Sequence, residues 1–137
     1  MKQNSLFRTL LVLMLMFMGS AMVQAQNPYA ILSNDKATLT FFYDNEKSAR
    51  NGMDIGPFSK KDERGWNEYR EMITTVVFHE SFAKMNSLKS TAHWFRGFEN
   101  LKSILNLENL KTDNVIDMSY MFDDCKLLSK PSVNPVL

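Results

Sequence analysis

The stretch that decides the fold runs from Asn114 to Leu128 and reads NVIDMSYMFDDCKLL. It closes a unit that the chain contains twice. Moving residues 75–101 onto residues 102–128 places identical or apolar residues opposite each other along the unit. The identical pairs are Lys84/Lys111, Phe95/Phe122 and Leu101/Leu128, and the apolar pairs are Val77/Ile104, Phe78/Leu105, Leu88/Val115, Trp94/Met121 and Phe98/Cys125. The sequence therefore predicts an internal repeat of about 27 residues.

Both units have the same internal order, which is clearest in the second. Residues 104–110 have the apolar character of a short strand and residues 111–114 are polar. Residues 115–122 carry apolar side chains at helical spacing, and residues 123–128 form a turn that leads to a leucine. One such unit cannot bury its own apolar face, whereas stacked units share a core. The predicted fold class is therefore α/β, a short solenoid of parallel strands and short helices.

The same residues carry a family resemblance. Residues 114–128 closely resemble the N-V-x-D-M-S-x-M-F-x-x-C-x-x-L signature of BspA-like leucine-rich-repeat bacterial surface proteins. Residues 94–101 look like a divergent first repeat with Phe98 in the cysteine position, and the preceding strands look like the leader of such chains. The resemblance implies a secreted or cell-surface protein that binds other proteins, in some relatives host matrix proteins. It implies neither catalysis nor a cofactor.

The sequence predicts that residues 26–72 form a β-hairpin cap in front of the repeats. The repeats are expected over residues 73–137. Residues 30–32 and 37–43 are strand-like and flank the turn-prone Ser33-Asn34-Asp35-Lys36. A polar loop is expected over residues 44–61, which contain Gly52, Gly56 and Pro57. Trp66, Tyr69, Met72 and Ile73 then predict a short helical turn on the core, and residues 73–78 predict a strand.

The N-terminus has the features of a cleavable secretory signal. Lys2 and Arg8 supply positive charge, residues 10–18 are apolar, and small residues follow. The apolar run is much shorter than the roughly 20 residues of a transmembrane helix. Val23 and Ala25 place cleavage after Ala25, so residues 1–25 are predicted to be a signal peptide. The alternative is an uncut N-terminal anchor.

The charge of the mature chain restricts the classes of partner that are expected, and its cysteine content restricts how the fold can be stabilised. The full chain has 16 basic and 15 acidic residues, and the signal segment removes two basic ones, which leaves a net charge of −1. Lys60 and Lys61 are followed at once by Asp62 and Glu63, so no basic stripe is available for nucleic acid or an anionic membrane. The lone Cys125 cannot form an internal disulfide, so a core must stabilise the fold.

Cys125 admits two interpretations. An unpaired cysteine in an exported protein can form an intermolecular disulfide. A buried apolar position is favoured, because the aligned residue of the first unit is Phe98. In that case the thiol is expected to resist alkylation in the folded protein.

Catalytic and metal sites are not predicted. His79-Glu80 resembles the start of H-E-x-x-H, but Ala83 stands where the second histidine is required. Cys125 with His93 or His79 has suitable chemistry for a hydrolase, yet no nucleophile-elbow context surrounds the cysteine. Asp117, Asp123 and Asp124 lack the glycine and the number of oxygen ligands expected of a calcium loop.

A third unit is expected to begin at Ser129 and to be interrupted, with Pro131 and Pro135 where the next strand should form. The alternative is a C-terminal cap. Three functions therefore stay open: a non-enzymatic, adhesin-like protein-binding module, a remnant of a longer repeat protein, and, more distantly, a small extracellular hydrolase. The first is the leading hypothesis.

Overall fold

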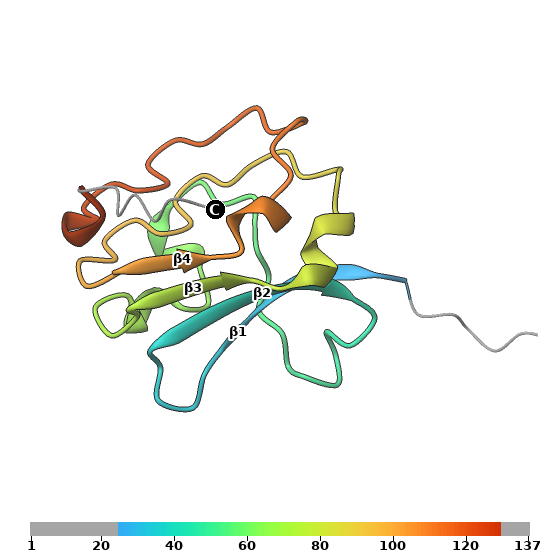
Figure 1. Ribbon diagram of the computed structural model, residues 1–137, viewed down its shortest axis with the longest axis horizontal. Helices are drawn as coiled ribbons and strands as arrows, with labels where there is room; N and C mark the ends of the chain where they lie inside the picture. Colours follow the sequence, from blue (N-terminus) through green and yellow to red (C-terminus); the bar gives the residue numbers. More distant parts are fainter. Residues whose placement is uncertain (1–24, 130–137) are drawn as a thin grey trace, which may run out of the picture.

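The computed structural model describes residues 25–129 of the chain. Most of the predicted signal peptide and of the third unit expected from Ser129 onward lies outside these residues. The described chain forms a mixed α/β domain with one open sheet of four strands (Figure 1). The strands lie in the order of the sequence: β1 (Asn27–Leu32), β2 (Thr38–Asp44), β3 (Thr75–Phe78) and β4 (Ser103–Leu105).

The first two strands form the predicted hairpin, which is confirmed. They pair antiparallel from Asn27 opposite Asp44 to Leu32 opposite Leu39. The turn is fixed by Asp35, whose carboxylate accepts hydrogen bonds from the Ser33 hydroxyl and the Ala37 amide. The following loop is more ordered than its composition indicates, because Met53 bridges back to Ala30 through two backbone hydrogen bonds of 2.9 Å.

The remaining strands are parallel, and their register corrects the sequence alignment by one residue. Val76 lies opposite Ile104 and Val77 opposite Leu105, whereas the alignment paired Val77 with Ile104. Alternation of side chains across a strand explains the difference, since a one-residue slip would turn Ile104 away from the core. The extra residue of the first unit lies at the end of the strand, because β3 has four residues and β4 has three. The turns that follow, η3 (Glu80–Lys84) and η4 (Leu107–Asn109), begin after N-caps at His79 and Asn106, which again have the spacing of the sequence alignment.

The helical segments are shorter than predicted. All are 3₁₀ turns within residues 25–129: η1 (Lys61–Glu63), η2 (Asn67–Tyr69), η3, η4 and η5 (Lys126–Ser129). Residues 115–122, predicted to be helical, contain no helix, and residues 104–110 form a strand only as far as Leu105. Tyr120 explains the first difference, because its left-handed φ of 57° interrupts any helix.

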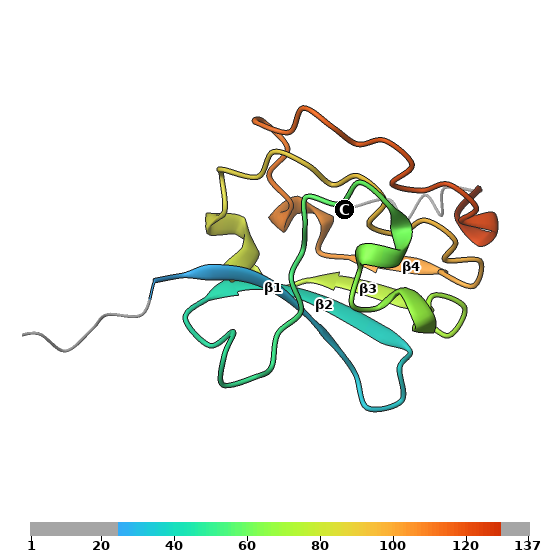
Figure 2. The ribbon, with the colours of Figure 1, turned by 180° about the vertical axis from the view of Figure 1, so that it is seen from behind.

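One aromatic core joins the predicted cap to the predicted repeats. Phe41 of β2 stacks on Phe78 of β3 at 5.1 Å and on Trp94 at 4.7 Å, and it meets Trp66 edge to face. All four side chains are fully buried. Figure 2 shows the segment with η1 and η2 lying across one face of the sheet, so residues from both predicted regions cover the same core.

Candidate functional site

Two segments of the chain have backbone hydrogen bonds at aligned positions. We call them the first coil (residues 90–101) and the second coil (residues 117–128). Trp94 N–H donates to the Thr91 carbonyl, and at the aligned position Met121 N–H donates to the Met118 carbonyl. Three further bonds recur in the same way: the amides of Arg96, Phe98 and Leu101 donate to the carbonyls three residues earlier, and so do the aligned amides of Asp123, Cys125 and Leu128. Left-handed residues also recur at aligned positions, at His93 and Tyr120 and at Gly97 and Asp124.

The two coils lie side by side in both views of the ribbon (Figures 1 and 2) and are joined by a row of backbone hydrogen bonds. Alternate amides of the first coil donate to alternate carbonyls of the second. The donors Thr91, His93, Phe95 and Gly97 meet the acceptors Asp117, Ser119, Met121 and Asp123 at 2.8 to 3.0 Å.

Side chains at aligned positions of the two coils add to this contact. His93 stacks on Tyr120 with ring centroids 5.2 Å apart, and Phe95 meets Phe122 at 5.6 Å. Arg96 forms an ion pair with Asp123, and Glu99 forms one with Lys126. The sequence alignment therefore identified residues that are neighbours in space.

The opposite side of the first coil is closed by Arg64. Its guanidinium donates to the carbonyls of His93, Trp94 and Arg96 at 2.6, 3.1 and 3.0 Å. The Trp66 indole N–H also donates to the Trp94 carbonyl. Burial away from water lowers the pKa of Arg64 to about 10, and no carboxylate forms an ion pair with it among the described residues. Arg64 therefore satisfies carbonyls that would otherwise need donors from another coil.

Arg64 was missed by sequence reasoning. It follows the charged run from Lys60 to Glu63, which is typical of a solvated loop. Its carbonyl acceptors lie about 30 residues further along the chain, so only the fold reveals the contact.

Cys125 is a core residue, as predicted. Its side chain is buried beside Phe98, and the thiol donates a hydrogen bond to the Phe95 carbonyl at 3.1 Å. Burial raises the pKa of the thiol to about 11, so the reactive thiolate is scarce at neutral pH.

The two histidines have packing roles. His79 Nδ1 accepts the Ser81 amide at 3.1 Å and lies 2.9 Å from the Ser81 hydroxyl, which caps η3. His93 stacks on Tyr120, and its Nδ1 is buried without a hydrogen-bond partner in the described part of the chain. The hydrogen bond of the Cys125 thiol goes to a backbone carbonyl rather than to either imidazole.

The acidic residues of the second coil have local partners. Hydrogen bonds from the Ser119 side chain and from its amide, the latter at 2.9 Å, lower the pKa of the Asp117 carboxyl, and Asp123 pairs with Arg96. Within residues 25–129, His, Cys, Asp and Glu do not gather in groups of three or more that could hold a metal ion.

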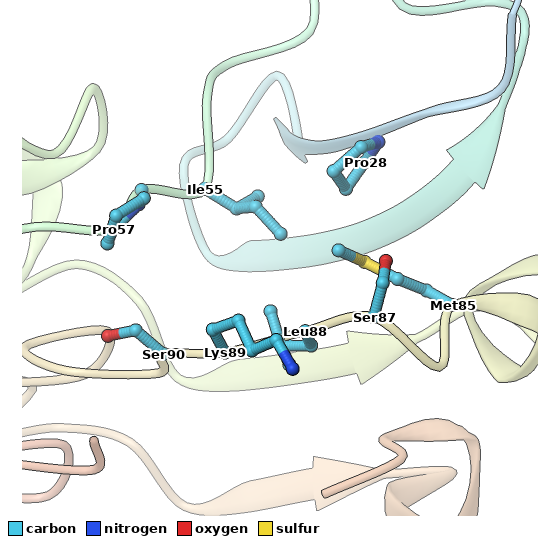
Figure 3. Close-up of a pocket in the computed structure, with 9 residues that line it drawn as sticks. Pro28, Ile55, Pro57, Met85, Ser87, Leu88, Lys89 and Ser90 are labelled. Carbon is cyan, nitrogen blue, oxygen red and sulfur yellow. The ribbon is translucent and has the colours of Figure 1, made fainter. Parts of the chain in front are cut away.

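A small apolar cleft lies where the cap meets the chain leading into the first coil. Figure 3 shows Pro28, Ile55 and Pro57 on one side and Met85 and Leu88 on the other, with Ser87, Lys89 and Ser90 at the rim. Its volume of about 190 Å³ is below the roughly 300 Å³ at which small-molecule sites begin. The cleft fits an apolar side chain better than a metabolite.

The largest unpartnered apolar feature is the far side of the second coil, which we call the open face. Tyr120 is 57% exposed and Phe122 is 47% exposed, whereas their first-coil counterparts His93 and Phe95 are 6% and 0% exposed. The second coil covers those counterparts, and in the described structure nothing comparable covers the second coil. The large exposed apolar residues of the second unit are Leu105, Leu107, Ile116, Met118, Tyr120, Phe122 and Leu127.

Comparisons with known proteins do not assign a family, because no family model, no curated protein and no solved structure matches the chain. In the described range, no helix has the length and apolar character needed to cross a lipid bilayer.

Proposed function

We propose that this chain is an exported, non-enzymatic module that binds other proteins through stacked leucine-rich-repeat-like units. The observation that carries the proposal is the open face. Positions that are buried in the first coil are about half exposed in the second. Of the eight large exposed apolar side chains in the described chain, seven lie in the second unit, and a gathering of exposed apolar side chains is typical of interaction sites in soluble proteins.

The composition of the open face favours a protein partner. Tyrosine, phenylalanine and methionine are enriched at the centres of protein interfaces, and Tyr120, Phe122 and Met118 lie next to one another in the coil. These three side chains are about half exposed, so they can contact a polypeptide at the surface rather than enclose a small molecule in a pocket. The proposal therefore names a protein ligand.

Two sequence features support the extracellular setting. The segment up to Ala25 has the features of a secretory signal, and the motif in residues 114–128 resembles that of BspA-like surface proteins. In some of those proteins the partner is a host matrix protein, so we propose a partner of this class. The position-by-position stacking of the two coils supports the short solenoid in this proposal.

The test is binding of the mature chain, residues 26–137, to a panel of immobilised extracellular matrix proteins by surface plasmon resonance. We expect saturable binding to at least one of them, weakened about tenfold or more by Tyr120→Ser or Phe122→Ser. Met72→Ser is the matched control, because Met72 is 51% exposed but lies outside the second coil. Circular dichroism checks that all variants fold. Binding that is absent, or equally sensitive to Met72→Ser, contradicts the proposal.

A further inference from the structure

The open face carries a row of four backbone amides that have no acceptor within residues 25–129, and we call this row the donor row. The donor row comprises the N–H groups of Met118, Tyr120, Phe122 and Asp124. These residues align with Thr91, His93, Phe95 and Gly97, whose amides in the first coil donate to carbonyls of the second coil. Within residues 25–129, no hydrogen bond from these four amides is formed. The second coil therefore repeats the donors of the first coil but has no neighbour to receive them.

The chemistry of this edge is one-sided. The carbonyls of Met118, Tyr120 and Phe122 already accept from the amides of Met121, Asp123 and Cys125 in the same coil. An ordinary edge strand offers donors and acceptors in alternation. Among the described residues this edge has donors without acceptors and no acceptor row of its own, so a complementary partner must present a row of carbonyl oxygens.

The second coil itself shows what such a partner is. It presents the carbonyls of Asp117, Ser119, Met121 and Asp123 to the first coil and places Tyr120 and Phe122 on the rings of His93 and Phe95. A third coil of the same geometry would meet the donor row and the two exposed rings in the same way. This contact uses backbone groups and needs no covalent link to the second coil.

We propose that the donor row and the open face capture a coil of this same repeat from a separate polypeptide. The inference rests on the proposed protein-binding role of the open face and adds to the matrix protein a second kind of partner. The mode is addition of a chain segment to a backbone edge, with hydrogen bonds supplying affinity and apolar contacts supplying selectivity.

A second folded copy of the described domain does not fit this role. Its second-coil carbonyls are occupied by the first coil, and its first-coil carbonyls at Trp94 and Arg96 are occupied by Arg64 and Trp66. In a second copy the carbonyl row of the second coil is therefore occupied throughout, and the aligned row of the first coil (Ser90, Ala92, Trp94 and Arg96) is occupied at two of its four positions. The captured coil must come from a repeat unit that is free of its own first coil.

The probe is a synthetic peptide of residues 102–129, which contains one complete second unit. Amide hydrogen exchange of the isotope-labelled mature chain is measured by NMR with and without the unlabelled peptide. We expect the peptide to slow exchange of the four donor-row amides at least tenfold, with saturation. Exchange of the hairpin-turn amides of Asn34 and Asp35 is expected to stay unchanged, because this turn lies at the far edge of the sheet.

The matched control is the same peptide with Tyr120→Ser and Phe122→Ser, which is expected to give little protection. Peptide binding that leaves the donor row unprotected overturns the inference, as does the absence of peptide binding. Protection that appears in the protein alone and rises with its concentration would identify a second copy as the occupant and also overturn it. Matrix-protein binding is measured separately, so each of these failures leaves the proposed function to its own test.

Discussion

At the scale of single residues, Arg64 is a charged side chain that is buried in the structure. It is 2% exposed, carries a charge without an ion-pair partner in the described chain, and donates to three carbonyls of the first coil. Burial of such a charge is tolerated only because carbonyl dipoles replace its water shell. We therefore infer that its role is to close one side of the coil stack.

Replacing Arg64 tests this role. Arg64→Met keeps most of the volume but removes three buried hydrogen bonds and leaves the Arg96 carbonyl without a donor among the described residues, so we expect a loss of about 2 to 4 kcal/mol in the free energy of unfolding. Urea denaturation of the mature chain is the measurement. Arg50→Met is the matched control, because Arg50 lies over the Phe42 ring at the surface and is expected to cost less than about 1 kcal/mol. Equal losses for both variants would show that Arg64 does not stabilise the protein by closing one side of the first coil.

Cys125 gives a second prediction at this scale. With its pKa raised to about 11 by burial, about one folded molecule in a thousand carries the thiolate at pH 8. Iodoacetamide is therefore expected to label the folded chain at least about 100-fold more slowly than the urea-unfolded chain. Mass spectrometry of timed samples checks this. Similar rates in both states would show that the thiol is exposed.

The same pKa shift determines whether the stability of the fold rises or falls at alkaline pH. The unfolded chain loses the thiol proton near the ordinary pKa of 9.0, whereas the folded chain keeps it up to about 11. Stability from this group is therefore complete below pH 9 and falls as the pH rises toward 11. A Cys125→Ala variant is expected to lack this component of the decline in urea titrations.

At the scale of elements, the sequence predicted which segments pair but not their register. Aligned identities such as Phe95 and Phe122 correctly matched the two coils. They could not show that the first unit has one more residue than the second between strand and coil, because the difference lies at the end of the strand, where β3 has four residues and β4 has three. The helical spacing of residues 115–122 was also misleading, since hydrogen bonds to the neighbouring coil replaced those of a helix.

The strand register can be tested with two neighbouring substitutions in β4. Ile104 packs against the core opposite Val76, whereas Leu105 is 48% exposed. We expect Ile104→Thr to lower the free energy of unfolding by about 1 to 2 kcal/mol and Leu105→Thr to change it by less than about 0.5 kcal/mol. The sequence alignment would instead place Leu105 opposite the buried Phe78, so the reverse order of losses would restore that register.

At the scale of the whole molecule, the two ends of the stack differ. Arg64 and Trp66 close the side of the first coil, whereas the second coil ends in half-exposed rings and in amides that have no acceptor within residues 25–129. Sequence reasoning predicted that stacked units would share a core, because apolar positions recur in both. It did not predict the polarity of the stack, because this depends on which backbone groups face outward after folding.

This polarity makes a prediction about a longer chain. A tandem duplication that inserts a copy of residues 103–129 after Ser129 would supply a third coil to the donor row and cover Tyr120 and Phe122. Each added repeat contributes an interface with its neighbour, so both the free energy of unfolding and its urea dependence should increase. Chemical denaturation followed by circular dichroism measures both quantities.

The control for the duplication is the same insert with Met121→Asp and Cys125→Asp in the added copy only. Both parent side chains are buried in the second coil, so the control copy cannot dock its apolar side although its length and backbone are the same. We expect the control to unfold at the urea midpoint of the original chain and the intact duplication to unfold at a higher one. If both long chains match the original, the donor row does not accept a coil even when one is covalently attached. Capture of a separate coil would then be excluded as well, since attachment only raises the local concentration of the docking segment.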